Sequence, residues 1–265
     1  MDEAGGVAAR GLCKVFNPGT PDARQALDRV DLDLAAGDFA VIIGSNGAGK
    51  STLLNALAGD IALDAGTLAV GAHDLTALPT HRRARWVARV FQDPLVGTAA
   101  SMTIEENLAV AESRGETRTL ALALSRQGRA RYAGRLASLG LGLESRLTTK
   151  VSMLSGGQRQ ALALLMAVMK RPALLLLDEH TAALDPRTAQ AVMDATLDAI
   201  KGAQLTTLMV THNMSHALRY GNRLLMMNAG RIILDVSGEQ KSQLTVDGLV
   251  EKFHLLDDKM LLAPS

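Results

Sequence analysis

The chain has 265 residues, of which 48% are hydrophobic and 21% charged, and its formal net charge is +1. This balance predicts a globular protein with a sizeable core, and the near-zero charge argues against a large nucleic-acid footprint. The single cysteine, Cys13, excludes an internal disulfide framework and is typical of a reducing compartment.

The amino end and the apolar segments give no sign of export or membrane insertion. Met1–Gly6 lacks the basic region and the apolar stretch of a secretory signal. Apolar runs such as Ala161–Met169 are too short to span a bilayer. We therefore expect no signal peptide and no transmembrane segment, so that any membrane role depends on a partner protein.

Strand-like and helix-like segments alternate along the chain, in an order typical of α/β nucleotide-binding domains. The expected strands are Asp31–Leu34, Phe39–Ile43, Val87–Phe91, Leu174–Leu177, Thr206–Val210, Leu224–Met227 and Ile232–Leu234. The expected helices are Lys50–Ala58, the segment after Gly157, and Pro186–Ile200. Turn residues between the first two strands, Gly37-Asp38, and between the last two, Asn228–Arg231, predict two hairpins.

Residues 101–150 differ from the rest, because they are rich in Ala, Leu, Arg and Glu at helical spacing. Breaks are expected at Gly115, Gly128 and Gly140. This block predicts a helical insertion within the α/β core. The short tail after Gly238 predicts a small helical cap.

One segment matches the phosphate-loop pattern, in which glycines precede a lysine and a hydroxyl residue at the start of a helix. Its residues are Gly44, Ser45, Asn46, Gly47, Ala48, Gly49, Lys50, Ser51 and Thr52. The glycines let consecutive N–H groups face phosphate oxygens, and the positive end of the helix adds to the attraction. Lys50 is expected to neutralise the β- and γ-phosphates of a nucleotide, and the Ser51 hydroxyl to bind Mg²⁺.

Two acidic residues, Asp178 and Glu179, end the apolar strand Leu174–Leu177. Two solvated acids would be the simpler explanation for an isolated strand, but the phosphate loop in the same chain favours a functional pair. Asp178 is expected to hold Mg²⁺. Glu179 is expected to orient or polarise the water that attacks the γ-phosphate.

A second anion-binding stretch lies between these motifs, at Leu154–Gln158. Its small residues Ser155, Gly156 and Gly157 would leave backbone N–H groups and one hydroxyl open at the start of a helix. Because the phosphate loop already cradles a nucleotide, the second patch indicates that two copies of the chain close around one ATP.

In this order, the motifs resemble those of the ATP-binding subunit of ABC transporters over about residues 8–235, and Leu154–Gln158 matches the family signature without substitution. Asp178–Pro186, with His180 where many members have proline, is similar to a bacterial importer subgroup for tryptophan, tyrosine and related solutes. The resemblance implies an α/β fold: a P-loop NTPase core with a parallel sheet, an antiparallel β subdomain and an inserted α-helical signature subdomain. It implies one ATP-binding domain over 1–265, divided into a core at about 1–92 and 160–238, a helical subdomain at 93–159 and a C-terminal cap at 239–265.

The resemblance also implies roles for single residues. Gln92 would sense Mg²⁺ and contact a membrane subunit, His212 would lie at the γ-phosphate, and Phe16 would stack on adenine. With Glu179, both Gln92 and His212 form the expected catalytic set. The residues expected to act across the dimer are Ser155, Gly156, Gly157, Gln158 and Asp185.

Each single residue also has a simpler explanation. Alone, His212 is a strand-end histidine, Gln92 a surface glutamine and Phe16 a core residue. For His180 we expect a local packing or hydrogen-bonding role, and for Arg82–Arg85 a solvated helix face rather than a nucleic-acid patch.

The implied function is an ATP-hydrolysing subunit that uses ATP and Mg²⁺ to energise a membrane ABC transporter through head-to-tail dimer closure. Import of an amino acid or a similar small solute is the leading expectation. An exporter or lipoprotein-release ATPase, and a soluble ABC ATPase that remodels a macromolecule, are the alternatives. Expected partners are a second copy of the chain, a polytopic membrane permease and a separate solute-binding protein, with no nucleic acid. The expected location is peripheral, on the cytoplasmic side of the inner or plasma membrane.

Overall fold

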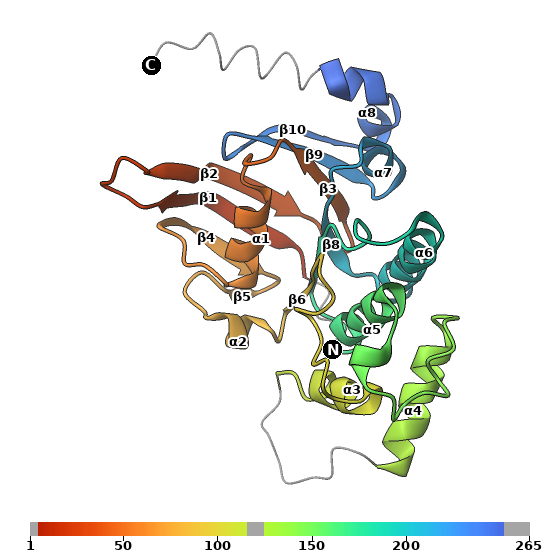
Figure 1. The fold of residues 1–265 in the computed structure, drawn as a ribbon. Coiled ribbons are helices and arrows are strands. Elements are labelled where there is room, and N and C mark those ends of the chain that lie inside the picture. Colours follow the sequence, from red (N-terminus) through yellow and green to blue (C-terminus); the bar gives the residue numbers. More distant parts are fainter. Residues whose placement is uncertain (1–4, 116–124, 252–265) are drawn as a thin grey trace.

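Two β-sheets of different construction frame the molecule, and helices lie between and around them (Figure 1). The computed structural model describes residues 5–115 and 125–251. The first sheet is antiparallel, in the order β2-β1-β4-β5, with β1 Val7–Phe16, β2 Arg24–Leu34, β4 Ala65–Val70 and β5 His73–Asp74. The second has the order β10-β9-β3-β8-β7-β6, with β3 Phe39–Gly44, β6 Val87–Val90, β7 Leu174–Asp178, β8 Thr206–Val210, β9 Arg223–Asn228 and β10 Arg231–Ser237.

The second sheet is parallel except for the β9–β10 pair, and its central strands are buried on both faces. The uninterrupted apolar runs explain this burial, since a strand covered on both faces needs no polar alternation. The predicted strands Leu174–Leu177 and Thr206–Val210 are confirmed. The carboxyl ends of β3, β7 and β8 meet at one edge of the sheet, where ligands bind in such folds.

Helices fill the layers on either side of this sheet (Figure 1). In chain order they are α1 Lys50–Ala58, α2 Thr80–Arg83, α3 Ile104–Glu112, α4 Arg126–Ala137, α5 Gly156–Val168, α6 Pro186–Ala203, α7 Met214–Arg219 and α8 Gly238–Ser242. Helix α1 lies between the sheets, where Leu53 belongs to the same apolar cluster as Leu12 of β1 and Ile42 of β3. On the other face, Met193 of α6 packs in a cluster with Val41 of β3.

Helices α3, α4 and α5 form a third packing unit beside the sheets (Figure 1). Leu108, Leu136 and Leu162, one from each helix, are fully buried in its apolar cluster. The predicted helical insertion is therefore confirmed for the described part of residues 101–150. Residues 116–124 of that block lie outside the described residues.

Two of the three helix breaks predicted at glycines in this block are correct. Gly115 and Gly140 follow helices in the left-handed region, with φ of 76° and 65°. Gly128 lies inside the first turn of α4, so the break predicted there is wrong. The reason is local: the Ser125 hydroxyl accepts a hydrogen bond from Gly128 N and caps the helix around it.

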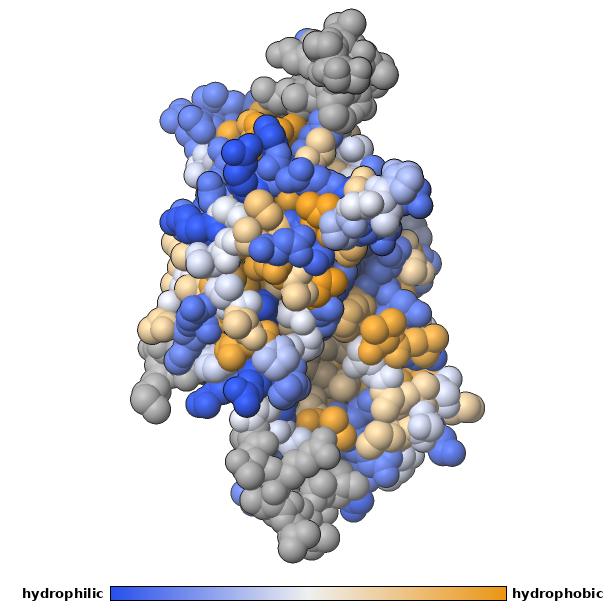
Figure 2. Space-filling view, turned by 90° about the vertical axis from the view of Figure 1, so that its left-hand side faces the viewer, coloured by the Kyte–Doolittle hydropathy of each residue, from blue (hydrophilic) through white to orange (hydrophobic). Residues whose placement is uncertain are grey.

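A groove separates α2 and β6 from α3 and α5, and we call it the α2–α3 groove. Its volume is about 930 Å³. Figure 2 shows a face of the molecule that is hollowed between the sheets and the helical unit, with apolar side chains inside the hollow. The larger apolar residues of the lining are Leu78, Trp86, Phe91, Val110 and Met166, and the basic ones are His81, Arg82, Arg85, Arg89 and Arg114. None of the described lining residues is Asp or Glu.

The hairpin predicted around Gly37-Asp38 is wrong. Strand β2 pairs with β1 in the first sheet, whereas β3 pairs with β8 and β9 in the second. Gly37, with φ of 81°, turns the chain out of one sheet and into the other. The turn is held by Asp38, whose carboxylate accepts hydrogen bonds from Ala35 N and Asn222 Nδ2. The closing hairpin, β9–β10, is confirmed.

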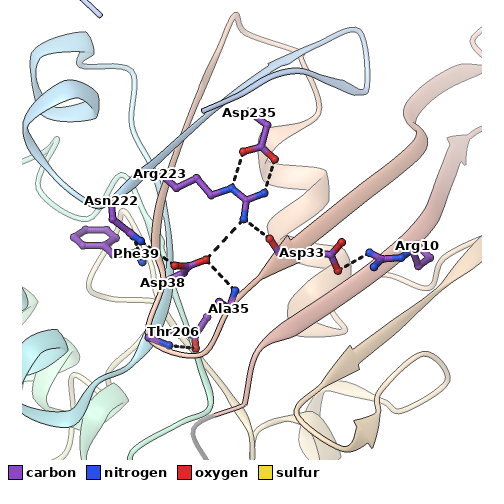
Figure 3. Close-up of polar contacts among 10 residues, drawn as sticks. Arg10, Asp33, Ala35, Asp38, Phe39, Thr206, Asn222, Arg223 and Asp235 are labelled. Atoms are coloured by element: carbon purple, nitrogen blue, oxygen red, sulfur yellow. Dashed lines mark hydrogen bonds and ion pairs between the residues drawn. The ribbon is translucent and has the colours of Figure 1, made fainter. Parts of the chain in front are cut away.

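A cluster of polar side chains fastens the two sheets to each other at this turn (Figure 3). Arg223 of β9 makes two bonds to the Asp235 carboxylate of β10 and donates to the backbone oxygen of Asp33 in β2. Arg10 of β1 pairs in turn with the Asp33 carboxylate. The forked pair with Asp235 lies within the second sheet and fixes the direction of the Arg223 guanidinium, whose remaining bond, to Asp33 O, crosses to the first sheet.

The helical cap predicted after Gly238 begins with α8, and its residues 252–265 lie outside the described residues. Within the described ranges, every helix is too short or too polar to cross a bilayer.

Candidate functional site

The glycine-rich turn between β3 and α1 forms a cradle of backbone. Gly47 and Gly49 have positive φ, 84° and 106°. A Cβ on Gly49 would lie 2.5 Å from the backbone oxygen of Ala26, and one on Gly47 would lie 2.6 Å from Arg24 Nη2. Only glycine fits both positions, so the turn can curl closely around an anion.

Lys50 lies at the centre of this cradle. Its side-chain nitrogen donates to the backbone oxygens of Gly44 and Ser45 at 2.7 and 2.9 Å, and the residue is only 8% exposed. Burial lowers the pKa of Lys50, while the nearby carboxylates of Glu179 and Asp178 act in the opposite direction. The predicted cationic and anionic groups of the site are therefore neighbours in space.

A cavity of about 180 Å³ opens over the cradle. Its lining is Phe16, Arg24, Ala26, Asn46, Gly47, Gly49, Lys50, Ser51, Thr52 and Glu179. Phe16, at the end of β1, is 37% exposed, as a stacking surface for a base requires. The backbone cradle, the lysine and the half-exposed ring fit the phosphates and the base of a nucleotide.

The acidic pair lies at the end of β7, where Asp178 is the last residue of the strand and Glu179 follows it. Asp178 accepts a 2.6 Å hydrogen bond from Arg89 Nη2 through its Oδ2 atom. Glu179 has φ of 43°, an uncommon value for a residue with a side chain, and its N–H donates to Val210 O. The Asp178 carboxylate and the Ser51 hydroxyl are hard oxygen donors, which is the ligand type that fits Mg²⁺.

His212, two residues after β8, lies beside Glu179. The distance from His212 Nδ1 to Glu179 Oε2 is 3.1 Å. A carboxylate only accepts hydrogen bonds, so the imidazole donates from Nδ1 in this contact. The structure thus brings together two of the three predicted catalytic residues.

The third, Gln92, is not brought into the cavity. It lies two residues after the end of β6, is exposed, and does not line the space over the cradle. The strand end before it is fixed, because Gln160 Nε2 of α5 donates to Phe91 O at 3.0 Å. Gln92 therefore begins the segment that links the sheet to the helical unit.

The signature stretch forms the start of α5, away from the cavity. The Ser155 hydroxyl accepts from Gln158 N and Gln158 Oε1 accepts from Ser155 N, a reciprocal capping arrangement. Ser155 and Gly156 are exposed, and neighbouring Met153 is 71% exposed. A Cβ on Gly157 would lie 1.9 Å from Thr188 Cγ2, so α5 and α6 approach each other only because this residue is glycine.

Asp185 caps the next helix, α6. Its carboxylate accepts from Thr188 N at 3.1 Å, and hydrogen bonding to Thr188 holds the pKa of this exposed group below its usual value. Asp185 and the signature residues thus share one surface around the starts of α5 and α6. None of them lines the nucleotide cavity of the same chain.

His180 has the local role expected of it. The residue is 2% exposed, and its Nε2 lies 3.1 Å from Thr196 Oγ1. Thr196 already donates its hydroxyl proton to Val192 O, so His180 Nε2 is the donor in this pair. Burial, with a smaller contribution from His216, lowers the pKa of His180 to about 4.

Three arginines have roles that the sequence patterns did not indicate. Arg24 reaches the cradle, where it donates to Gly47 O at 2.8 Å, and Arg89 bonds Asp178. The solvated face predicted for Arg82–Arg85 is wrong for Arg83, which is 3% exposed and donates to carbonyl groups at the end of α1, including Ala56 O. A charged residue among apolar neighbours in sequence was the available signal for Arg89.

The chain is similar to known ATP-binding proteins over most of its length. A family model described as ABC transporter matches residues 27–182. The chain is 43% identical to the tyrosine transport ATP-binding protein of Clostridioides difficile (strain R20291), over 92% of this chain and 97% of that protein. It is 35% identical to the thiamine import ATP-binding protein ThiQ of Salmonella typhimurium, over 77% and 82%.

Solved structures give the same result for the fold. The ADP conformation of MJ1267, an ATP-binding cassette of an ABC transporter, has a TM-score of 0.77 and 26% identity, covering 95% of this chain and 98% of that one. The dimeric post-hydrolysis state of the ATP-binding cassette MJ0796, bound to ADP and Pi, has a TM-score of 0.75 and 26% identity, covering 87% and 98%.

Proposed function

Because the chain belongs to the ABC transporter family and is an ATPase, we propose that it energises the import of an amino acid. The observation that carries this proposal is the 43% identity with a tyrosine transport protein along nearly the whole of both chains. The other named relatives take part in import of different small solutes, such as thiamine and methionine. An aromatic amino acid is therefore the proposed solute, delivered by a separate solute-binding protein.

The chemistry proposed for the cavity of each chain follows from the contacts of its residues. The cradle from Gly44 to Thr52 binds the phosphates, Lys50 neutralises them, and Phe16 stacks on the base. Glu179 takes a proton from the water that attacks the γ-phosphorus, and the bond from that phosphorus to the bridging oxygen of ADP breaks. His212 holds Glu179 in place. Ser51 and Asp178 would hold Mg²⁺, and Gln92, which lies outside the cavity here, would complete its ligands; the ion would supply positive charge at the phosphate oxygens.

The second half of each site is proposed to come from another copy of the chain. Within Ser155–Gln158, the exposed residues Ser155 and Gly156 lie near Asp185 on a surface that the cavity of their own chain does not use. In a head-to-tail dimer this surface closes over the phosphates of the partner, so ATP stabilises the dimer by binding between the copies. The dimeric structures of the ATP-binding cassette MJ0796 support an assembly of two copies.

The α2–α3 groove is the proposed docking site of the membrane permease. It lies beside Gln92, between the nucleotide-binding sheet and the helical unit, so a protein seated in it contacts both parts. Its described lining combines apolar side chains with arginine and histidine and contains no carboxylate. Trp86 Nε1 and Arg114 Nε are buried there without a hydrogen-bond acceptor among the described residues.

An apolar lining with basic residues fits one kind of occupant, a short amphipathic helix of the permease that carries acidic residues. Its apolar face would cover Trp86 and Met166, and its carboxylates would meet the arginines. Docking there places the chain at the cytoplasmic side of the membrane.

For the domain organisation, we propose one ATP-binding domain over residues 1–265. Its core is formed by residues 1–92 and 160–238, its helical subdomain by 93–159 and its C-terminal cap by 239–265.

The test is to isolate the complex from native membranes with a tagged chain, identify its membrane subunit, and measure ATP-driven uptake after reconstitution. Tyrosine, tryptophan, thiamine and methionine are the labelled solutes to compare. The charge reversal Arg82→Glu with Arg85→Glu should release the permease, while reversal at exposed Arg29 and Lys201 should not. Uptake of thiamine but not of aromatic amino acids would contradict the solute, and retention of the permease by Arg82→Glu/Arg85→Glu would contradict the docking site.

A further inference from the structure

Arg89 occupies a junction between the nucleotide site and the α2–α3 groove. It lies on β6, in register with Leu176 of β7 and three residues before Gln92. Its side chain is 11% exposed, and its guanidinium stacks 4.7 Å from the ring centre of Phe91. The side chain is therefore held by packing as well as by charge.

The guanidinium connects three separate segments. Its Nη2 donates to Asp178 Oδ2 at 2.6 Å, and its Nη1 donates to Asn55 Oδ1 at 2.6 Å and to Asp60 Oδ2 at 3.0 Å. Asn55 belongs to α1, the helix that begins at Lys50, and Asp60 follows that helix. A planar fork of this kind fixes the direction of every acceptor that it binds.

We propose that Arg89 is a positioning residue for the metal-binding carboxylate: it holds Asp178 by Oδ2 so that Oδ1 stays directed to Mg²⁺. This inference rests on the proposed ATP and Mg²⁺ site. Through its bond to Asn55, Arg89 also links the orientation of Asp178 to α1, the helix that follows the phosphate loop. Without the fork, the Asp178 carboxylate can rotate into the space left by the arginine.

The opposite effect, repulsion of Mg²⁺ by the arginine charge, is the weaker one. Arg89 is bonded to Asp60 as well as Asp178, so its charge is already matched inside the cluster. Partners that orient a metal-binding carboxylate contribute about 10- to 100-fold to metal affinity. The loss of Arg89 should therefore weaken Mg²⁺ binding and leave metal-free ATP binding intact.

The experiment measures ATP affinity by fluorescence titration, once in EDTA and once in Mg²⁺, in a Glu179→Gln background that does not consume ATP. Arg89→Ala should leave the affinity in EDTA within about twofold and reduce the gain on adding Mg²⁺ by about tenfold. Arg89→Lys, which keeps the charge and loses the fork, should lose about threefold of that gain. Thermal unfolding in EDTA shows whether each variant is folded.

Arg10→Ala is the matched control, because Arg10 also pairs with an aspartate, Asp33, and neither residue lines the cavity over the cradle. It should keep the full Mg²⁺ effect. An undiminished or larger Mg²⁺ effect in both Arg89 variants would overturn the inference, and so would an equal loss of affinity with and without metal. If Arg89→Ala does not fold, Arg89→Lys decides on the same criteria. Absence of ATP binding in the Glu179→Gln parent would instead overturn the proposed site.

Discussion

His212 Nδ1 lies 3.1 Å from Glu179 Oε2, and this contact joins the residues that follow β8 and β7. It leaves Glu179 Oε1 without a described partner of its own, at the rim of the cavity over the phosphate cradle. Such a carboxylate is restrained on one oxygen and can accept a proton on the other.

Glu179→Gln should keep ATP binding and reduce turnover by about two to four orders of magnitude, because the amide cannot accept the proton of the attacking water. Phosphate release measures turnover, and nucleotide titration measures binding. Asp198→Asn, an exchange of the same kind on α6, is the control and should hydrolyse ATP at the wild-type rate. Wild-type hydrolysis by Glu179→Gln would rule out its catalytic role.

Ser155→Arg should bind ATP as a monomer but fail to dimerise, because the bulky cation covers the exposed start of α5. Light scattering with ATP in the Glu179→Gln background distinguishes monomer from dimer. Ser138→Arg, at an exposed position beyond α4, should dimerise normally. A normal ATP-dependent dimer of Ser155→Arg would contradict the composite site.

Gly157→Ala should lower the free energy of unfolding by about 2 kcal/mol, because its methyl group would overlap Thr188 Cγ2. Thr188→Ser removes Cγ2 and keeps the hydroxyl, so the double variant should recover most of the loss. Urea unfolding measures each value. Equal stabilities of Gly157→Ala and the Gly157→Ala/Thr188→Ser double variant would show that the contact between α5 and α6 is not the cause.

His180 should make the protein less stable as the pH falls from about 6.5 to about 4. Its pKa is lowered to about 4 by folding, so in this range the unfolded chain binds a proton that the folded chain excludes. Relative to His180→Gln, the wild type should lose about 3 kcal/mol of unfolding free energy between these limits. Urea unfolding at several pH values measures the difference, and exposed His81→Gln should show the wild-type slope. Parallel pH profiles for His180→Gln and wild type would contradict the effect.

Elements with strong local signals could be predicted from the sequence. Helix α1 ends at Gly59, whose φ of 85° caps it, and β8 is a run of five buried residues. Strands β1 and β4 escape local patterns, because they pair across more than fifty residues and β1 carries several register shifts. The wrong prediction of a hairpin at Gly37 also arises from contacts that are distant in sequence. Turn residues indicate that the chain changes direction, but they do not indicate which sheet the next strand joins.

The site divides in a similar way. Contiguous motifs locate the phosphate cradle and the acidic pair, because their chemistry depends on neighbours in sequence. Arg24, Arg83 and Arg89 act on backbone or carboxylate groups many residues away, so only the folded chain reveals them. Arg83 is the clearest case. Its basic neighbours in sequence favoured a solvated surface, whereas its side chain is buried and donates hydrogen bonds to carbonyl groups at the end of α1.

The charge of the α2–α3 groove has a practical consequence for anyone who isolates the protein. Charge pairs at an accessible interface weaken as ions accumulate, and the screening length falls from about 8 Å at physiological salt to about 3 Å at 1 M. With arginines and no described acid in the groove, the proposed attachment to a membrane permease should respond steeply to ionic strength. A high-salt wash should therefore strip the protein from its membranes, and gentle low-salt preparation should retain it.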